Sequence, residues 1–330
     1  MLNKLNFTTE PLKNKNISIV GAGFYGLMLG IFLSKHNKVT IYESDSDVMT
    51  QASSLCQMRI HTGMMYPRNI KTALSCMQTF KPFMLKFKDA IIDDFKSIYA
   101  VAKDSKISAD DFYDVQKSLG QSIKKIPNEF FDNNLIQGVY ECNEFTFDPL
   151  IIKKILLDKC YKHKVKILLN YKINNLNDLY NYDHIYMCNY SGINELLISS
   201  NLEPLDLVNK KFEKIFARDN LGNTSVCVVD GNYFSSMVLP NSNIKTYTSA
   251  ELSEIHTLDN ITRFNEVFNR VKTYIPEIKL EYIKSQFGYK TIFNNSISRN
   301  CYIQKVNPKT TVILGGKITN VFELFKELAL

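Results

Sequence analysis

The sequence predicts an α/β protein, α+β overall, in which a Rossmann-like domain is interrupted by a domain built on an antiparallel sheet. Two stretches support this prediction. Residues 17–43 run through an apolar strand, a glycine-rich turn, an apolar helix and a second strand, which is the order and about the length of one βαβ unit. Residues 205–290 alternate at period two in short runs separated by turn residues, as antiparallel strands do.

The glycine-rich turn, residues 21–26, reads Gly-Ala-Gly-Phe-Tyr-Gly. In a turn of this spacing the first glycine permits a tight bend, the second lets the backbone approach a pyrophosphate, and the third lets the helix pack closely on the strand. The second strand ends on an acid, 22 residues after the first glycine, where a carboxylate can hydrogen-bond a ribose hydroxyl. The pattern therefore predicts a dinucleotide site. The residues that it assigns to the cofactor are Gly21, Gly23, Gly26 and Glu43.

Later segments are expected to complete the Rossmann-like domain. Asp148 and Pro149 have the residue types of a helix N-cap and first turn, so they predict a helix over 150–161. Apolar runs at 183–188 and 311–314 predict further strands of the same sheet. We therefore expect a discontinuous cofactor-binding domain and a substrate domain inserted into it. The first comprises residues 1–75, 146–200 and 295–330, and the second comprises 76–145 and 201–294.

Residues 90–145 contain no second glycine fingerprint and are predicted to form a separate layer on the substrate side. Apolar positions at 3–4 spacing predict a helix over 70–87. A second helix is expected over 108–119, with Ser108 as its N-cap.

The net charge of +7 comes from 40 basic and 33 acidic residues, in pairs such as Lys124-Lys125 and with no run of five. This spread predicts a solvated surface and neither a nucleic-acid nor a membrane partner. The apolar run from Ile19 to Leu33 is shorter than the ~20 residues that a bilayer requires, so no integral membrane segment is expected.

The seven cysteines are odd in number and irregular in spacing, and none forms a CxxC pair. This usage predicts reduced thiols and a cytoplasmic location. Neither HxH nor HExxH occurs, so no metal site is expected.

Four motifs in chain order resemble one family. They are VGAGFYG…IYE at 20–43, RIHTGMMYPRNIKTALSC at 59–76, TFDP at 146–149 and LGGKITNVFEL at 314–324. The chain resembles the FAD-dependent oxidoreductases of the D-amino-acid oxidase superfamily. That group includes glycine and sarcosine oxidases, glycerol-3-phosphate dehydrogenases and 2-hydroxyglutarate oxidases. The resemblance implies FAD as the cofactor.

The resemblance also implies further site residues. The family's closing GGKxT segment matches Gly315, Gly316, Lys317 and Thr319, near the pyrimidine end of the flavin. The segment with Arg59, His61 and Gly63 passes close to the isoalloxazine, where His61 could be a general base, a flavin contact or a covalent attachment point.

Two basic residues, Lys290 and Arg299, are candidates for anchoring an anionic or polyhydroxylated substrate. Lys290 stands where amino-acid oxidases often have an arginine. A lysine does not reproduce the bidentate carboxylate contact of arginine, so the amino-acid clamp departs from the family pattern.

These features predict an FAD-dependent oxidase or dehydrogenase, a flavoprotein oxidoreductase. It would remove a hydride from a C–H bond beside an amine or hydroxyl of a small amino acid, 2-hydroxy acid or sugar-derived metabolite. Its electron acceptor, oxygen or another, and its state as a homodimer or monomer are left open. Alternatives are a mutase-type or tailoring flavoenzyme of sugar or natural-product biosynthesis, a flavin-dependent tRNA-modifying enzyme, and a non-enzymatic nucleotide-binding protein.

Overall fold

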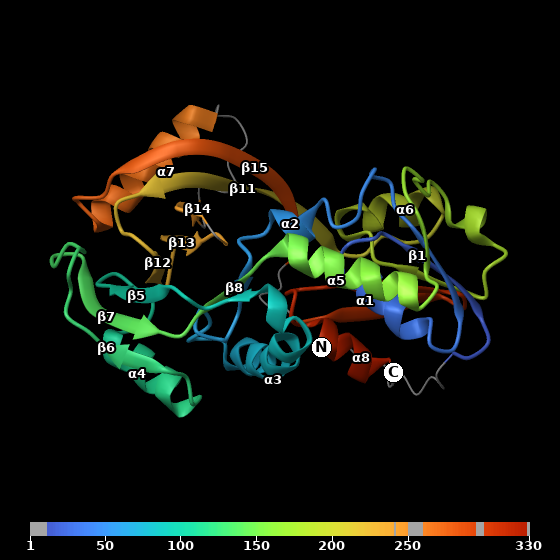
Figure 1. Ribbon diagram of the computed structural model, residues 1–330, viewed down its shortest axis with the longest axis horizontal. Coiled ribbons are helices and arrows are strands. Elements are labelled where there is room, and N and C mark those ends of the chain that lie inside the picture. Colours follow the sequence, from blue (N-terminus) through green and yellow to red (C-terminus); the bar gives the residue numbers. More distant parts are fainter. Residues whose placement is uncertain (1–11, 241, 250–259, 295–299, 329–330) are drawn as a thin grey trace. The chain divides into compact units, whose positions relative to one another are not determined.

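A computed structural model of the chain describes residues 12–240, 242–249, 260–294 and 300–328, which belong to two compact units (Figure 1). The first unit comprises residues 1–54, 150–209 and 291–330, and the second comprises 55–149 and 210–290. Residues 55–75, which the sequence grouped with the cofactor half, lie in the second unit. The reason is strand pairing, since β3 (Arg59–Ile60) pairs with β8 (Phe145–Phe147) there.

The first unit is built on a six-stranded sheet in the order β16-β17-β10-β1-β2-β9. All neighbours in this sheet are parallel except β16 and β17, which are antiparallel. The strands expected after the first βαβ unit do join it in one sheet. The strand bounds are β1 (Asn16–Val20), β2 (Lys38–Tyr42), β9 (Lys166–Leu168), β10 (His184–Met187), β16 (Tyr302–Asn307) and β17 (Thr310–Leu314).

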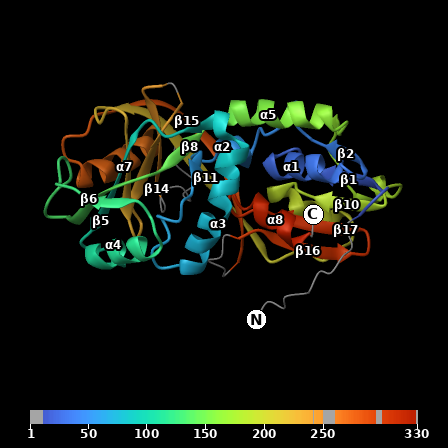
Figure 2. The ribbon, with the colours of Figure 1, turned by 60° about the horizontal axis from the view of Figure 1, so that its bottom comes forward.

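Helices cover both faces of this sheet, which explains why its strands read as continuous apolar runs. On one face lies α1 (Phe24–Leu33), and Phe32 of α1 stacks on Phe325 of α8 (Val321–Glu327) with ring centroids 4.7 Å apart. Figures 1 and 2 both draw α5 (Pro149–Lys162) beside α1. The opposite face packs on α6 (Ile193–Ser199) and on the 3-10 turn Leu176–Leu179.

The second unit is built on an eight-stranded sheet in the order β15-β11-β14-β13-β12-β5-β7-β6. The strands expected from the alternation of residues 205–290 are confirmed. Most neighbours in this sheet pair antiparallel, but β5 and β12 pair parallel. The prediction that residues 90–145 form a separate layer is wrong, because β5, β6 and β7 extend the eight-stranded sheet. The bounds are β5 (Lys96–Ala102), β6 (Ile123–Lys125), β7 (Ile136–Cys142), β11 (Leu207–Asp219), β12 (Thr224–Val229), β13 (Phe234–Val238), β14 (Ile244–Ser249) and β15 (Leu280–Phe293).

One face of this sheet carries α7 (Asn260–Tyr274), whose Val267 and Val271 pack on apolar residues of β5, β11 and β12. Beside β6 and β7 lies α4 (Ala109–Ser118), where Ser108 Oγ accepts a hydrogen bond from the Asp111 amide and confirms the expected N-cap. A three-stranded sheet, β3-β8-β4, completes the unit. The remaining elements are α2 (Ala52–Leu55), α3 (Ile70–Lys86), β4 (Ile91–Ile92) and the 3-10 turns Lys88–Ala90 and Tyr190–Gly192. Across the described ranges, no helix combines the length and apolarity needed to span a bilayer.

Candidate dinucleotide-binding site

The order of strands in the first unit defines where a ligand can bind. From β1 the chain moves to β2 and then β9 on one side, whereas β10 and β17 lie on the other side of β1. Open parallel sheets bind ligands outside the carboxyl ends of their strands at such a switch point. Here the switch point lies between β1 and β10. The glycine turn follows β1 directly. The topology therefore supports the prediction that a dinucleotide binds at this turn.

Gly21 is held at this point by both its conformation and its neighbours. Its φ is +102°, in the left-handed region that favours glycine. A Cβ added to Gly21 would lie 2.8 Å from the Cys188 carbonyl oxygen and 3.1 Å from the Asn189 Cα, which follow β10. Its amide donates to the Tyr42 carbonyl at 2.7 Å, at the end of β2. Only glycine therefore permits β1 to end between its two neighbouring strands in this way.

The other two glycines of the turn differ in what they contact. A Cβ on Gly26 would lie 1.9 Å from the Gly21 carbonyl oxygen, so Gly26 is required for the helix to pack on the turn. Gly23 has an ordinary φ of −68°, and the nearest atom to its added Cβ is Ser53 Oγ at 3.3 Å. Ser53 Oγ also accepts a hydrogen bond from the Phe24 amide at 2.9 Å. The fold thus requires Gly21 and Gly26, whereas a Cβ at Gly23 would need only a small shift of the Ser53 hydroxyl.

The carboxylate of Glu43 is fixed against the same turn. Its Oε2 accepts a hydrogen bond from the Ala22 amide at 2.7 Å, and its Oε1 accepts from the Asp45 amide at 3.0 Å and Ser44 Oγ at 3.1 Å. Oε1 uses both of its lone pairs in these bonds, whereas Oε2 keeps one, so the group is oriented and Oε2 can still accept another hydrogen bond. The acid at the end of β2 therefore lies beside the backbone of the glycine turn.

A second glycine segment, which follows β17, contacts the first turn through Tyr25. A Cβ on Gly315 would lie 2.3 Å from the Tyr25 ring, and the Tyr25 hydroxyl donates to the Lys317 carbonyl at 2.6 Å. Burial raises the pKa of Tyr25 well above its usual value, so the phenol remains a hydrogen-bond donor. Tyr25 occupies a variable position of the glycine pattern, and for that reason the sequence did not single it out.

Two buried polar atoms in this region have no hydrogen-bond partner within the described ranges. They are Asn189 Oδ1, beside Gly21 at the end of β10, and Thr319 Oγ1, in the turn that follows Gly315. Thr319 is completely buried. Buried polar atoms are nearly always paired, so these two are consistent with a polar ligand that supplies the partner. These two atoms, together with the lack of a side chain at Gly23, therefore fit a dinucleotide.

In the second unit, Arg59 belongs to a buried polar cluster. Its Nη1 donates to Glu144 Oε2 at 2.8 Å and to the Tyr99 hydroxyl at 3.0 Å, and its Nη2 donates to the Ser236 carbonyl at 3.2 Å. Thr62 Oγ1 and the Tyr99 hydroxyl donate to the other oxygen of Glu144. The guanidinium is therefore committed to a buried ion pair that fixes β3 and the residues after it. Its predicted contact with the cofactor stays a prediction.

His61 and Gly63 follow β3 and are positioned by this cluster. Gly63 has a φ of +108°, and an added Cβ would lie 3.0 Å from the Ala73 carbonyl oxygen. The Thr62 carbonyl between them accepts from Gln121 Nε2 at 2.6 Å. His61 is half-buried, with its ring centroid 5.8 Å from that of Tyr66. The histidine thus lies on a constrained turn.

Of the two predicted substrate anchors, the first lies on a strand of the second unit. Lys290 is exposed on β15. Arg299 lies outside the described residues.

The sequence did not identify Lys214 of β11 as a candidate. Lys214 is completely buried, and its Nζ donates to the Cys56 carbonyl at 3.1 Å. Burial, and secondarily the nearby charge of Lys284, lowers the pKa of Lys214 to about 8. The lysine could therefore exchange a proton near neutral pH. No pattern in the sequence marks it, because a lysine within a strand is ordinarily read as an exposed residue.

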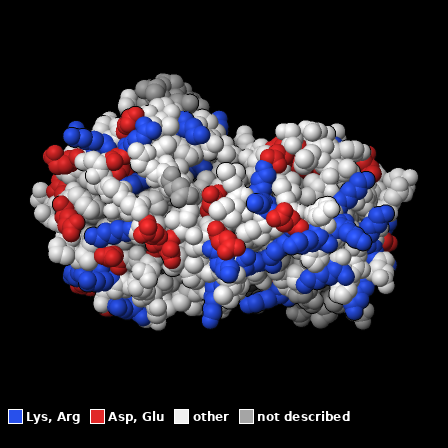
Figure 3. Space-filling model, in the orientation of Figure 1, with Lys and Arg blue, Asp and Glu red and all other residues white. Residues whose placement is uncertain are grey.

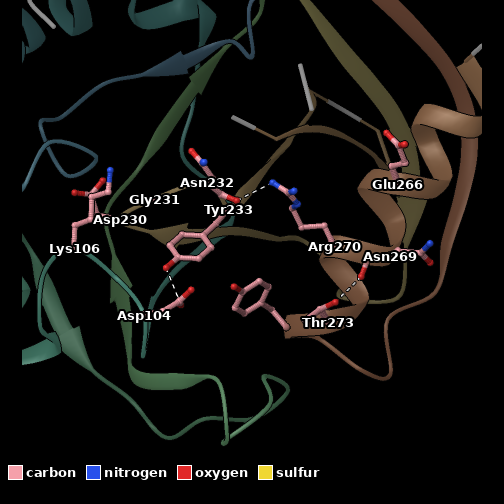
Figure 4. A pocket seen from close by; sticks show the side chains of 11 residues that line it. Asp104, Lys106, Asp230, Gly231, Asn232, Tyr233, Glu266, Asn269, Arg270 and Thr273 are labelled. Carbon is pink, nitrogen blue, oxygen red and sulfur yellow. Dashed lines mark hydrogen bonds between the residues drawn. The ribbon is translucent and has the colours of Figure 1, made fainter. Parts of the chain in front are cut away.

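The second unit also contains a polar pocket of about 570 Å³, between the face of α7 and the ends of neighbouring strands (Figure 4). Two tyrosines, Tyr233 and Tyr274, meet edge to face with centroids 5.5 Å apart. The Tyr233 hydroxyl donates to Asp104 Oδ1 at 2.9 Å, and Arg270 Nη1 donates to the Asn232 carbonyl at 2.8 Å. Carboxylates and cations both line the pocket, so its charge does not select one class of ligand. No motif predicted it, because its lining comes from segments distant in sequence.

Among the described ranges, no group of three or more histidine, cysteine or carboxylate side chains could hold a metal ion.

The chain shares its fold with solved oxidases and a dehydrogenase, which confirms the fold that the sequence predicted. Glycine oxidase from Geobacillus kaustophilus superposes with a TM-score of 0.74 at 14% identity, over 97% of this chain and 94% of that one. For L-α-glycerophosphate oxidase from Mycoplasma pneumoniae, solved with FAD bound, the TM-score is 0.74 at 15% identity, over 96% and 94%. L-proline dehydrogenase from P. horikoshii superposes with a TM-score of 0.72 at 11% identity, over 94% of this chain and 91% of that one.

Similarity to curated sequences is confined to a short region. The FAD-dependent monooxygenase kojA of Aspergillus flavus and the probable one of Aspergillus oryzae are each 29% identical over 106 residues. The match covers 30% of this chain and only 25% of either relative. No family model matches the sequence.

The buried Arg59–Glu144 pair gives a first prediction. Each side chain is 1% exposed, so Glu144→Gln leaves the guanidinium buried without its counter-charge and should lower the free energy of unfolding by roughly 3–5 kcal/mol. Chemical denaturation measures this change. The control is Glu195→Gln, which breaks the exposed Lys172–Glu195 pair and should cost less than about 1 kcal/mol. Equal effects of the two substitutions would contradict the structural role of the buried pair.

Proposed function

We propose that the protein is an FAD-dependent oxidoreductase that removes a hydride from a C–H bond beside an amine or hydroxyl of a small polar metabolite. The observation that carries the proposal is the glycine turn at the switch point between β1 and β10, where Gly23 has no side chain to hold a pyrophosphate off the backbone. The shared fold supports the same class of chemistry. The similar structures are named as a glycine oxidase, an L-α-glycerophosphate oxidase and an L-proline dehydrogenase.

Each end of the cofactor has candidate partners in the first unit. The backbone of Gly21 and Gly23 would approach the pyrophosphate, because neither residue has a side chain to hold it off. Glu43, oriented by the Ala22 amide, would accept a hydrogen bond from a ribose hydroxyl. Gly315, Gly316, Lys317 and Thr319 would hold the flavin end, where the positive charge of Lys317 favours negative charge on the ring.

The remaining chemistry belongs to the protein. FAD, when bound, supplies a two-electron acceptor for the hydride. A substrate amine or hydroxyl must also lose a proton, and we propose His61 as the group that accepts it. Lys290 and Arg299 are our candidates for holding an anionic group of the substrate. These catalytic roles follow from the family pattern and the residue chemistry.

The proposed activity predicts that the purified chain is yellow or takes up FAD on reconstitution. A substrate should bleach the flavin absorbance without oxygen, so a panel of amino acids, 2-hydroxy acids and sugar derivatives identifies the substrate class. Readmitting air then tests oxygen as the acceptor, and acid precipitation tests whether FAD is covalently attached. A folded chain that neither retains nor takes up FAD would contradict the proposal.

Gly23→Ala separates ligand binding from folding. The φ of Gly23 suits alanine and Ser53 Oγ is its nearest neighbour, so the ligand-free melting temperature should change little. FAD affinity should fall by roughly tenfold or more, equivalent to at least ~1.4 kcal/mol, because the methyl group obstructs the pyrophosphate. Fluorescence titration measures the affinity. Gly222→Ala in the second unit is the control: its φ of +60° makes alanine cost some stability, but FAD affinity should not change.

Unchanged FAD affinity in Gly23→Ala would mean that the glycine turn does not contact the pyrophosphate. Gly26→Ala provides a contrast, because its Cβ would collide with the Gly21 carbonyl oxygen and destabilise the fold itself.

A further inference from the structure

The first unit gathers lysines on one surface, although the sequence suggested that the charge is spread out. Residues 153–172 contain seven lysines, a single acid, Asp158, and no arginine. Figure 3 shows basic side chains gathering over the region where Figure 1 places α5. Because no more than two of these lysines are consecutive, a search for longer runs of charge misses them. The helix and the edge strand β9 bring them together.

Two of the seven lysines are paired with acids and five are not. Lys153 contacts Asp47, and Lys172 contacts Glu195 at 2.8 Å. The other five form no ion pair with any carboxylate in the part of the chain that the structure describes. We call these five the α5 basic face, and they are Lys154, Lys159, Lys162, Lys164 and Lys166.

Apolar side chains are exposed on the same surface. The inner side of α5 is buried through Ile152, Leu156 and Cys160, at helical spacing. On the outer side Leu150 is 72% exposed and Tyr161 is 86% exposed. Large apolar side chains among unpaired lysines are a combination that interfacial membrane-binding surfaces use, since the lysines meet anionic headgroups and the apolar groups enter the headgroup boundary.

The composition favours a lipid surface over other anionic partners. Protein interfaces are depleted in lysine, which loses much side-chain entropy when it is buried. Phosphate recognition in nucleic acids commonly uses arginine, which is absent from this stretch. An anionic headgroup layer needs neither bidentate contacts nor a fixed partner geometry, so flexible lysines suffice.

We propose that the α5 basic face, with Leu150 and Tyr161, binds peripherally to a bilayer that contains anionic lipids. Binding of this kind places the face at the membrane surface and needs no segment that crosses the bilayer. This proposal is independent of the flavin and of the reaction.

Flotation of the full-length chain with vesicles tests the proposal. Wild type should float with phosphatidylcholine vesicles that contain about one-third phosphatidylglycerol, and not with phosphatidylcholine alone. The triple variant Lys154→Gln, Lys162→Gln and Lys164→Gln should lower vesicle affinity by about two orders of magnitude, because each lysine contributes about a factor of five.

A matched control removes the same charge elsewhere. Lys103→Gln, Lys124→Gln and Lys125→Gln replace three exposed lysines of the second unit and should leave vesicle affinity unchanged. Tyr161→Ser should reduce the residual binding that persists at high salt, where the electrostatic part is screened. Circular dichroism confirms that each variant is folded.

Failure of the wild type to bind anionic vesicles, or equal losses in the two triple variants, would overturn the proposal. Binding of the wild type to an RNA homopolymer or an acidic protein, with no vesicle binding, would overturn it as well, because the face would then serve a different partner.

Discussion

The close contact between Gly21 and the end of β10 is the constraint on which the first unit depends. The residue has a positive φ, and the Cys188 carbonyl lies where its side chain would be. Because β1 and β10 meet at the switch point, this contact determines how the following turn and helix leave the sheet. Gly21 also leaves the backbone directly after β1 without a side chain, as the close approach of an anionic cofactor would require. The same glycine would thus meet a requirement of folding and a requirement of the proposed cofactor binding.

Much of this unit could be predicted from the sequence, because local patterns encode it. The strand, turn, helix and strand of residues 17–43 each have a distinct residue pattern, and the structure contains all four. Tyr25 and Ser53 could not be predicted in the same way. Their roles depend on segments brought together by the sheet: Tyr25 contacts a carbonyl 292 residues away, and Ser53 caps a helix amide 29 residues away. No local pattern reports such contacts.

The second unit was harder to predict for a related reason. Strands β11 and β15 carry lysines and glutamates along their length, so neither shows the apolar run that marks a buried strand. The parallel pairing of β5 with β12 joins residues about 130 positions apart and leaves no trace in periodicity. Arg59 illustrates the same limit at a single residue. The carboxylate that pairs with its guanidinium is 85 residues away in the sequence, so no local pattern could identify that partner.

The central claim is that one dinucleotide site combines the turn after β1 with the turn after β17. Hydrogen–deuterium exchange of the chain with and without FAD tests it most directly, because it reports each backbone segment separately. The account predicts that FAD slows amide exchange in residues 21–26 and in residues 315–319 together. Protection confined to other segments, with both turns unchanged, would contradict it.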